Sequence, residues 1–281
     1  MDIRLNGRRG STAWRVLDRT EIWTDRRKEF RASSLPFCPR AFWLDKKLQP
    51  ASRRSFTDEV RLWRGHGIHD CLQYWMGQAG ILFGDWECTI CKRSLGADYV
   101  IHDMLGPPGQ CPHHGATLRY REYELDYEGL TGHPDGLTPD EADAGAFSLL
   151  EFKTLQHRGY KGSSYPDWLT IKKPYEPHIE QANAYACMVQ ELKGFRITQV
   201  LIWYVSIDRP SWAPKIFEFE PDWERFQRHL DVIREIENQD LDGLPPVCDP
   251  DAKSPFCIFA DAGYCSMRSR DLQRHLREQE P

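Results

Sequence analysis

Strand patterns and helix patterns alternate through most of the sequence, and this order constrains the fold more than any other feature. Helix patterns occupy residues 42–48, 57–80, 177–192, 223–236 and 271–280. Strand patterns occupy residues 117–127, 130–137, 147–153, 197–207 and 215–219. We therefore predict an α/β fold in which a mixed central sheet is flanked by helices.

The composition is that of a chain able to bury a core, since 40% of its 281 residues are hydrophobic and 28% are charged. The longest apolar run, near residues 200–207, is too short to span a bilayer and is expected to form one buried strand. The first residues carry charges without the apolar stretch of a secretory signal. We expect a cytoplasmic protein that does not bind membranes.

Charge is distributed unevenly along the chain. Residues 1–64 contain 16 basic and 8 acidic side chains, and the remaining residues contain 21 basic and 34 acidic ones. A basic first part fits a protein that grips a polyanion, and a solvated basic face is the open alternative. The expected parts are a basic arm (1–30), a helical part (31–84), a small cysteine-bearing insertion (85–115), a core (116–240) and a cysteine-rich tail (241–281).

The most informative chemistry lies in two neighbouring strand patterns. Asp135 follows Gly132-His-Pro, and the next strand ends with Glu151-Phe152-Lys153. Because side chains alternate along a strand, Glu151 and Lys153 share one face while Phe152 points into the core. If the strands pair, Asp135 and Glu151 can converge on Mg²⁺ or Mn²⁺, with Lys153 beside the metal-bound water. The plain alternative is a hairpin whose edge carries a Glu–Lys pair.

Two helical patterns flank these strands in the sequence. Gly65-x-x-x-His69 lies upstream, and Gln181-x-x-x-Tyr185 lies downstream with both side chains on one helix face. In this order the four patterns resemble those of the PD-(D/E)XK nuclease superfamily, and within it the RecB-like exonuclease branch. The resemblance covers about residues 31–270 and implies a restriction-endonuclease-like core.

The resemblance also implies roles. Metal would be bound by His69, Asp135, Glu151 and the Phe152 carbonyl, and Lys153 would be the catalytic lysine. Gln181 and Tyr185 would contact a DNA phosphate or support the site. The products would carry a 5′-phosphate and a 3′-hydroxyl.

The nine cysteines, in a chain without a signal peptide, favour metal binding over disulfides. The segment around Cys38 and Arg40 is similar to the one that opens iron–sulfur RecB-like nucleases, including CRISPR-associated exonucleases. That similarity implies a 4Fe–4S cluster held by Cys38, Cys248, Cys257 and Cys265, with Arg40 contacting DNA. The wide spacing of the three late cysteines leaves zinc or unligated thiols open.

A second cysteine set lies in the middle of the chain. Cys88-Thr-Ile-Cys91 and Cys111-Pro-His-His114 each resemble half of a zinc site, and together they predict tetrahedral Cys₃His coordination. His113 is the rival fourth ligand. The insertion is too small to have a core of its own, so the zinc ion would have a structural role.

Four residues in helix patterns are interpreted as structural. Cys71 and Cys187 are expected to be buried thiols. Trp63 and Trp75 are expected to lie in the core, and stacking platforms for bases are the alternative for these two side chains.

The leading functional hypothesis is a DNA nuclease that depends on a divalent metal and acts on ends or single strands. No Walker A pattern is present, so a helicase or recombination partner is expected for long duplex. A repair or recombination role linked to viruses or CRISPR is implied by the resemblance alone. The alternative is a non-catalytic DNA-end-binding scaffold that keeps the nuclease fold. The sequence does not predict an oligomeric state.

Overall fold

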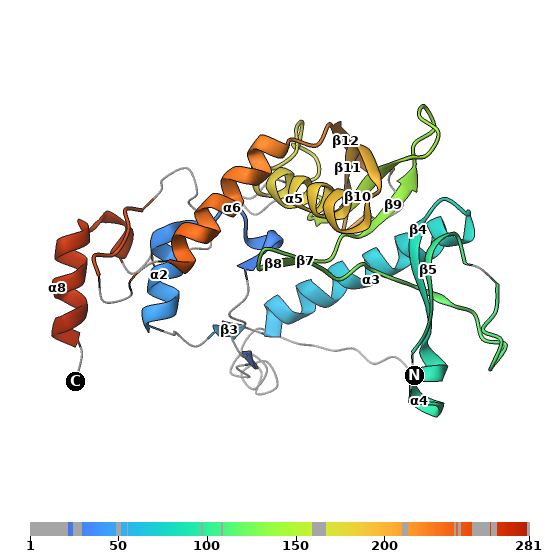
Figure 1. Ribbon diagram of the computed structural model, residues 1–281, viewed down its shortest axis with the longest axis horizontal. Helices are drawn as coiled ribbons and strands as arrows, with labels where there is room; N and C mark the ends of the chain where they lie inside the picture. Colours follow the sequence, from blue (N-terminus) through green and yellow to red (C-terminus); the bar gives the residue numbers. More distant parts are fainter. Residues whose placement is uncertain are drawn as a thin grey trace, which may run out of the picture.

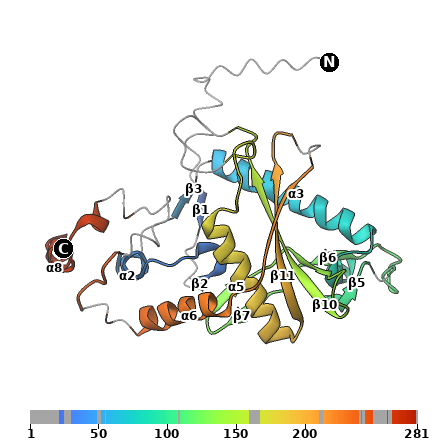
Figure 2. The same ribbon diagram turned by 90° about the horizontal axis from the view of Figure 1, so that it is seen from above.

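The computed structural model describes residues 22–24, 30–48, 52–54, 56–96, 98–107, 109–158, 167–209, 213–238, 240, 243–248, 259 and 263–279. Its centre is a seven-stranded sheet with helices packed on both faces (Figure 1 and Figure 2). The predicted α/β class with a mixed sheet flanked by helices is confirmed.

The main sheet has the order β12-β11-β10-β9-β4-β5, with β6 paired to β4. Its strands are β4 (Phe83–Cys88), β5 (Tyr99–Leu105), β6 (Arg119–Arg121), β9 (Gly136–Pro139), β10 (Ala146–Leu155), β11 (Arg196–Ser206) and β12 (Lys215–Phe219). Strands β10 and β11 run parallel, whereas the other pairs are antiparallel. Since the parallel pair needs a crossover, the helix between these two strands must cross a face of the sheet.

The crossover helix α5 (Glu176–Lys193) covers one face of the sheet, and α3 (Phe56–Gln78) crosses the other (Figure 2). Successive side chains of β10 point to opposite faces of the sheet and fill both cores. Leu149 packs in the same core as α5, whereas Leu150 and Phe152 pack with Met76 of α3. Helix α6 (Trp223–Glu237) lies against α5. Both layers therefore meet at β10, the strand that carries the Glu-x-Lys pattern.

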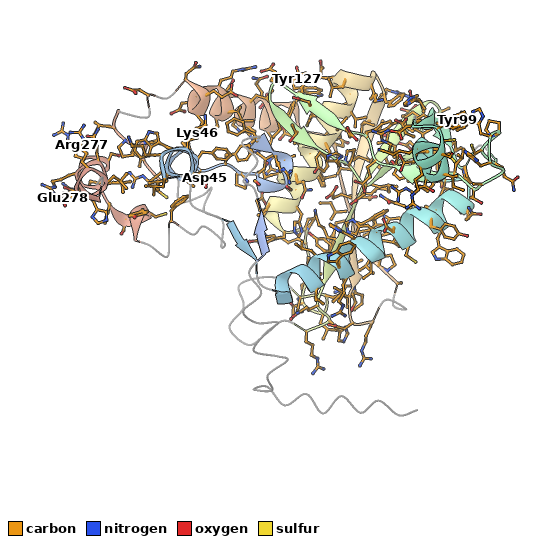
Figure 3. All side chains as sticks on the ribbon, turned by 90° about the horizontal axis from the view of Figure 1, so that it is seen from below. Asp45, Lys46, Tyr99, Tyr127, Arg277 and Glu278 are labelled. Carbon is orange, nitrogen blue, oxygen red and sulfur yellow. The ribbon has the colours of Figure 1, made fainter. Side chains whose placement is uncertain are left out.

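A second, three-stranded sheet lies beside the main one, with the order β2 (Phe30–Arg31), β8 (Leu130–Gly132) and β7 (Leu125–Tyr127). The short helix η1 (Ala32–Ser34) follows β2 and contacts α5. Figure 3 shows Tyr127 of β7 near α6, where its ring centroid lies 5.8 Å from that of Phe226. Strands β1 (Ile22–Thr24) and β3 (Ser52–Arg54) pair with each other. A short helix, α4 (Thr89–Ser94), follows β4.

The early helix α2 (Pro39–Leu48) and the late helix α8 (Ser269–Gln279) lie together at one end of the molecule (Figure 1). They share a small core of their own, in which Trp43 and Leu44 pack with Leu272 and Leu276. The short helix η2 (Tyr264–Ser266) precedes α8. Segments more than two hundred residues apart are thereby brought into contact.

The structure refines several sequence expectations. The strand expected at 130–137 is broken between β8 and β9, where Pro134 cannot donate to a ladder. The strand expected at 117–127 is likewise divided into β6 and β7. The insertion expected to begin at residue 85 begins inside β4, which pairs with β6 and β9. None of the described helices is both long and apolar enough to cross a membrane.

Three predictions about helix α3 are wrong. The side chains of Trp63 and Trp75 are 73% and 63% exposed, and Cys71 is also exposed. The inner face of α3 is occupied instead by Leu72 and Met76, which pack beneath β10. Cys187 in α5 is buried, as expected.

Candidate functional site

Asp135 lies in the bend between β8 and β9, and two hydrogen bonds fix its carboxylate. Its Oδ2 accepts from the backbone N–H of Phe152 at 2.5 Å, and its Oδ1 lies 2.9 Å from His69 Nδ1. The side chain is buried, with 5% of the residue exposed. A carboxylate held from β10 on one side and α3 on the other is oriented before any ligand arrives.

Glu151 and Lys153 extend from the same face of β10, as the alternation predicts. Lys153 Nζ donates to Glu151 Oε1 at 2.6 Å and to Gln181 Oε1 at 2.8 Å. Phe152 points to the opposite face, where its ring centroid lies 5.7 Å from that of Trp203. The lysine is therefore held between a carboxylate of β10 and an amide of α5.

The carboxylate of Glu151 is buried, and only one of its two oxygens has a hydrogen-bond partner among the described residues. Its residue is 2% exposed, and Oε2 has no hydrogen-bond partner among the described residues. Burial raises the pKa of Glu151 to about 7, with Lys153 opposing this shift and the charge of Asp135 reinforcing it. Because a buried anion without a donor is costly, this oxygen is suited to face a cation.

His69 shares the electrostatic field of this cluster. Burial lowers the pKa of His69, but the charge and hydrogen bond of Asp135 outweigh it, and the net shift is upward. Glu151 reinforces the upward shift and Lys153 opposes it. The structure thus brings together the four residues expected to carry chemistry: an imidazole, two carboxylates and an ammonium.

The metal-ligand atoms of His69, Asp135 and Glu151 do not all lie within 4.8 Å of one another; in the part of the chain that is described, only a cysteine set meets that spacing. One carboxylate oxygen of Glu151 is turned toward Lys153 instead. A shared ion would require these three side chains to draw closer together.

Gln181 and Tyr185 form a buried support behind Lys153. Gln181 Nε2 donates to the Tyr185 hydroxyl at 3.0 Å, and both residues are at most 9% exposed. A Cβ added at Gly132 would lie 2.1 Å from Tyr185 Cε1, so the tyrosine ring packs directly on the β8 backbone. Of the two roles expected for this pair, the geometry fits support of the site.

Two residues of the site were missed by the sequence analysis. Gln73 of α3 donates from Nε2 to Glu122 Oε1 at 2.8 Å and to the Asp135 carbonyl at 2.9 Å. Burial and the charge of Asp135 raise the pKa of Glu122 to about 7, although the Gln73 hydrogen bond opposes this. The one available signal was that Gln73 follows His69 by four residues, on the same helix face.

The middle cysteine set forms a group that could hold a metal ion. The sulfurs of Cys88, Cys91 and Cys111 all lie within 4.8 Å of one another, and the three residues are buried. Burial raises the pKa of the Cys88 thiol, but hydrogen bonds from the backbone N–H groups of Cys91 and Ile90 outweigh it, so the net shift is downward. Amide donors aimed at a sulfur stabilise its thiolate, the form that binds metal.

The expected fourth ligand, His114, is exposed and lies apart from these sulfurs. Its Nε2 is 3.0 Å from Ser94 Oγ at the end of α4. The rival, His113, has its ring centroid 5.5 Å from that of Tyr99. The structure shows three converged thiols, and neither histidine joins them within 4.8 Å.

The thiols at the other end of the molecule also converge. Cys38 Sγ and Cys248 Sγ are 3.8 Å apart, and the Cys248 thiol also hydrogen-bonds to Cys265. Burial, the bond to Cys265 and the nearby Cys38 raise the pKa of Cys248 to about 12. Cys257 lies outside the described residues. Cys248 thus lies beside both Cys38 and Cys265 where α2 contacts the tail, although the three sulfurs do not all lie within 4.8 Å of one another.

The expectation that Arg40 contacts DNA is wrong. Its side chain is buried, with 2% of the residue exposed. The guanidinium donates to the carbonyls of Pro246 (2.5 Å), Tyr264 (3.1 Å) and Met267 (2.6 Å) and to Ser269 Oγ (3.0 Å). Because all these acceptors belong to the tail, Arg40 binds the tail to α2 beside Cys38.

The fold and the site define an α/β protein with an Asp–His–Glu–Lys cluster, whose two carboxylates are buried, and a three-thiol group. No protein-family model matches the sequence, and no curated protein is significantly similar to it.

Proposed function

We propose that this protein is a DNA nuclease of the PD-(D/E)XK type that depends on a divalent metal. The observation that carries the proposal is the buried Glu151 Oε2, which lacks a hydrogen-bond partner among the described residues and lies in the charge field of Asp135 and His69. The hydrogen bond from Lys153 to Glu151 places an ammonium group beside this carboxylate, and the ammonium is the second group that the hydrolysis needs. A RecB-like exonuclease acting on ends or single strands is the form we favour.

The donor set fits Mg²⁺ or Mn²⁺, since Asp135 and Glu151 offer hard oxygen ligands, the Phe152 carbonyl adds another, and His69 offers a nitrogen. When bound, such an ion polarises the scissile phosphate and lowers the pKa of water. Lys153 orients the water and offsets negative charge on the phosphoryl oxygens. Gln181 holds the lysine in place for this task.

The reaction is hydrolysis of a phosphodiester. The water oxygen bonds to phosphorus as the bond from phosphorus to the 3′ oxygen breaks. One proton of the water ends on the 3′ oxygen, giving a 3′-hydroxyl, and the products carry a 5′-phosphate. Duplex longer than a frayed end requires a partner that opens it, such as a helicase or a recombination protein.

The two thiol groups are part of the proposal. Cys88, Cys91 and Cys111 would hold zinc, with His114 as the fourth ligand after its ring turns away from Ser94. Zinc there would fix α4 to β4.

Cys38, Cys248 and Cys265, with Cys257, would hold a 4Fe–4S cluster or zinc that joins the tail to α2. A brown colour in protein purified without oxygen identifies the cluster. A colourless preparation with a matching amount of extra zinc identifies zinc.

The decisive experiment is cleavage of end-labelled linear single-stranded DNA with Mn²⁺, comparing wild type with Lys153→Met. We expect the variant to lose at least about a thousandfold in rate, because it removes a charge that acts in the transition state. DNA binding, measured by fluorescence anisotropy, should persist.

The matched control is Lys172→Met, which removes an exposed lysine outside the cluster. Its cleavage rate should equal that of wild type. Cleavage by Lys153→Met at the wild-type rate contradicts the proposed mechanism. Wild type and Lys153→Met that are both inert yet both bind DNA support the scaffold alternative instead.

A further inference from the structure

A polar cavity of about 460 Å³ opens over the three-stranded sheet. Arg31 of β2 pairs with Thr131 of β8, which pairs with Asp126 of β7. All three residues line the cavity, since paired residues on adjacent strands project to the same face. One face of this small sheet therefore forms the cavity floor, with a cationic end on β2 and an anionic end on β7.

The cavity adjoins the candidate centre. Tyr185, Gly132 and His133 form its wall, and His133 lies two residues before Asp135. The Tyr185 hydroxyl accepts hydrogen bonds from Gln181 Nε2 and from the backbone N–H of His133. Since Gln181 also accepts from Lys153, two hydrogen bonds connect the cavity wall to the lysine.

The charged side chains that line the cavity are placed as a nucleotide requires, with a cation at one end for the phosphate and carboxylates at the other end for the base. Arg31 offers a fork of donors for a phosphate, and Ser33 and Thr131 offer hydroxyls. At the other end, Asp126 and Glu124 offer acceptors for base N–H groups. With neighbouring strands about 4.8 Å apart, these ends are about 10 Å apart, which is comparable to the reach from the phosphate of a nucleotide to the far edge of its base.

The anionic end remains available as an acceptor. Arg121 Nη2 lies 2.8 Å from Glu124 Oε1, and this pairing lowers the pKa of Glu124. Asp126 is exposed within the cavity. The Glu124 carboxylate is therefore ionised at neutral pH and accepts hydrogen bonds, which a pocket for a bare phosphate would not need.

We propose that this cavity holds the terminal nucleotide of a DNA strand, so that the protein releases 5′-mononucleotides from an end. The inference rests on the proposed nuclease function and adds the mode of cleavage. The volume lies in the range of cavities that hold one small molecule, so it accommodates a single nucleotide but not a duplex. Arg31 binds the phosphate, and Asp126 and Glu124 receive the base edge.

The first test measures binding without turnover. Isothermal titration calorimetry with 5′-dGMP, in buffer without added divalent ion, compares wild type with Arg31→Gln and Asp126→Asn. We expect each substitution to weaken binding about tenfold or more, because each removes a charge-assisted hydrogen bond. The control Arg274→Gln, on α8 and exposed, should bind like wild type.

Circular dichroism and thermal unfolding confirm that each variant is folded. If Arg31→Gln fails to fold, Asp126→Asn carries the test alone, because its exposed side chain leaves the core intact. Wild-type protein that does not bind 5′-dGMP at millimolar concentration overturns the inference. Equal binding by wild type and the folded variants overturns it too.

The second test measures product length on uniformly labelled linear single strands, with a single-stranded circle in parallel. We expect mononucleotides from the linear strand, an intact circle, and an increased KM for Arg31→Gln. Oligonucleotide products or a cut circle overturn the inference while the nuclease function stands. Binding of 5′-dGMP that depends on Arg31, in a protein that cleaves nothing, overturns the function while the cavity assignment stands.

Discussion

The carboxyl group of Glu122 should make the protein less stable as the pH rises, and replacing it with an amide should remove that part of the pH dependence. Its pKa rises from 4.5 to about 7, through burial first and the charge of Asp135 second. At about 1.4 kcal/mol for each unit of pKa, this shift corresponds to about 3 kcal/mol in the free energy of unfolding. We take about 2 kcal/mol, because the side chain is only partly shielded from water.

The sign follows from linkage. An acid whose pKa is higher in the folded protein contributes stability that is fully present below its unfolded value of 4.5 and is lost as the pH rises through about 7. Glu122→Gln stays neutral, and Gln73 can still donate to its amide oxygen. The variant should therefore equal wild type near pH 4.5 and exceed it by about 2 kcal/mol at pH 8.

The assay is thermal unfolding at pH 4.5 and pH 8, with no divalent ion and no chelator added to either buffer. The expected gain at pH 8 is a midpoint about 4 °C above wild type. Glu141→Gln, an exposed carboxylate in the β9–β10 turn, is the control and should show no such difference. A difference in unfolding midpoint between Glu122→Gln and wild type that is the same at both pH values would refute the reasoning.

Two further predictions concern packing and metal. Gly132→Ala should destabilise the protein by about 3 kcal/mol, because its Cβ would lie 2.1 Å from the buried Tyr185 ring. The control Gly67→Ala, whose Cβ would have nothing within 4 Å, should stabilise α3 by up to about 1 kcal/mol. Equal changes in the free energy of unfolding for the two variants would contradict this. Cys91→Ala should lower bound zinc, measured by elemental analysis, by about one ion per chain, and Cys71→Ala should leave it unchanged; zinc retained by Cys91→Ala would exclude the thiol site.

Periodicity predicted the elements around the site well because each is set by local sequence. Helix α5 begins at Glu176, with Pro177 in its first turn, and ends at Lys193; the next residue, Gly194, has a φ of +71° that suits a residue without a Cβ. The alternation of Glu151, Phe152 and Lys153 is likewise a property of the strand backbone. These features need no knowledge of what packs against the element.

The residues that sequence reasoning misplaced depend on distant contacts. Arg40 is buried because tail carbonyls, more than two hundred residues away, accept its hydrogen bonds. Trp63 has the spacing of a core residue, but α3 is apolar on two faces and β10 covers only one. Glu122 acquires its shifted pKa from Asp135 and its hydrogen bond from Gln73, neither of which its own segment indicates.

The three-thiol group and the candidate centre are separate sites joined by one hydrophobic core. Cys88, Cys91 and Cys111 belong to the same buried cluster as Leu150 and Phe152 of β10. If the three thiols bind metal as proposed, removing it would loosen that cluster and so displace β10. Under the proposed function, loss of either ion would stop cleavage, so inactivation by a chelator would not identify the ion that performs the chemistry. Restoring activity with Mg²⁺ alone, while the zinc content stays at zero, would show that metal at the thiol group is dispensable. That result would contradict the proposed dependence of the candidate centre on the thiol group.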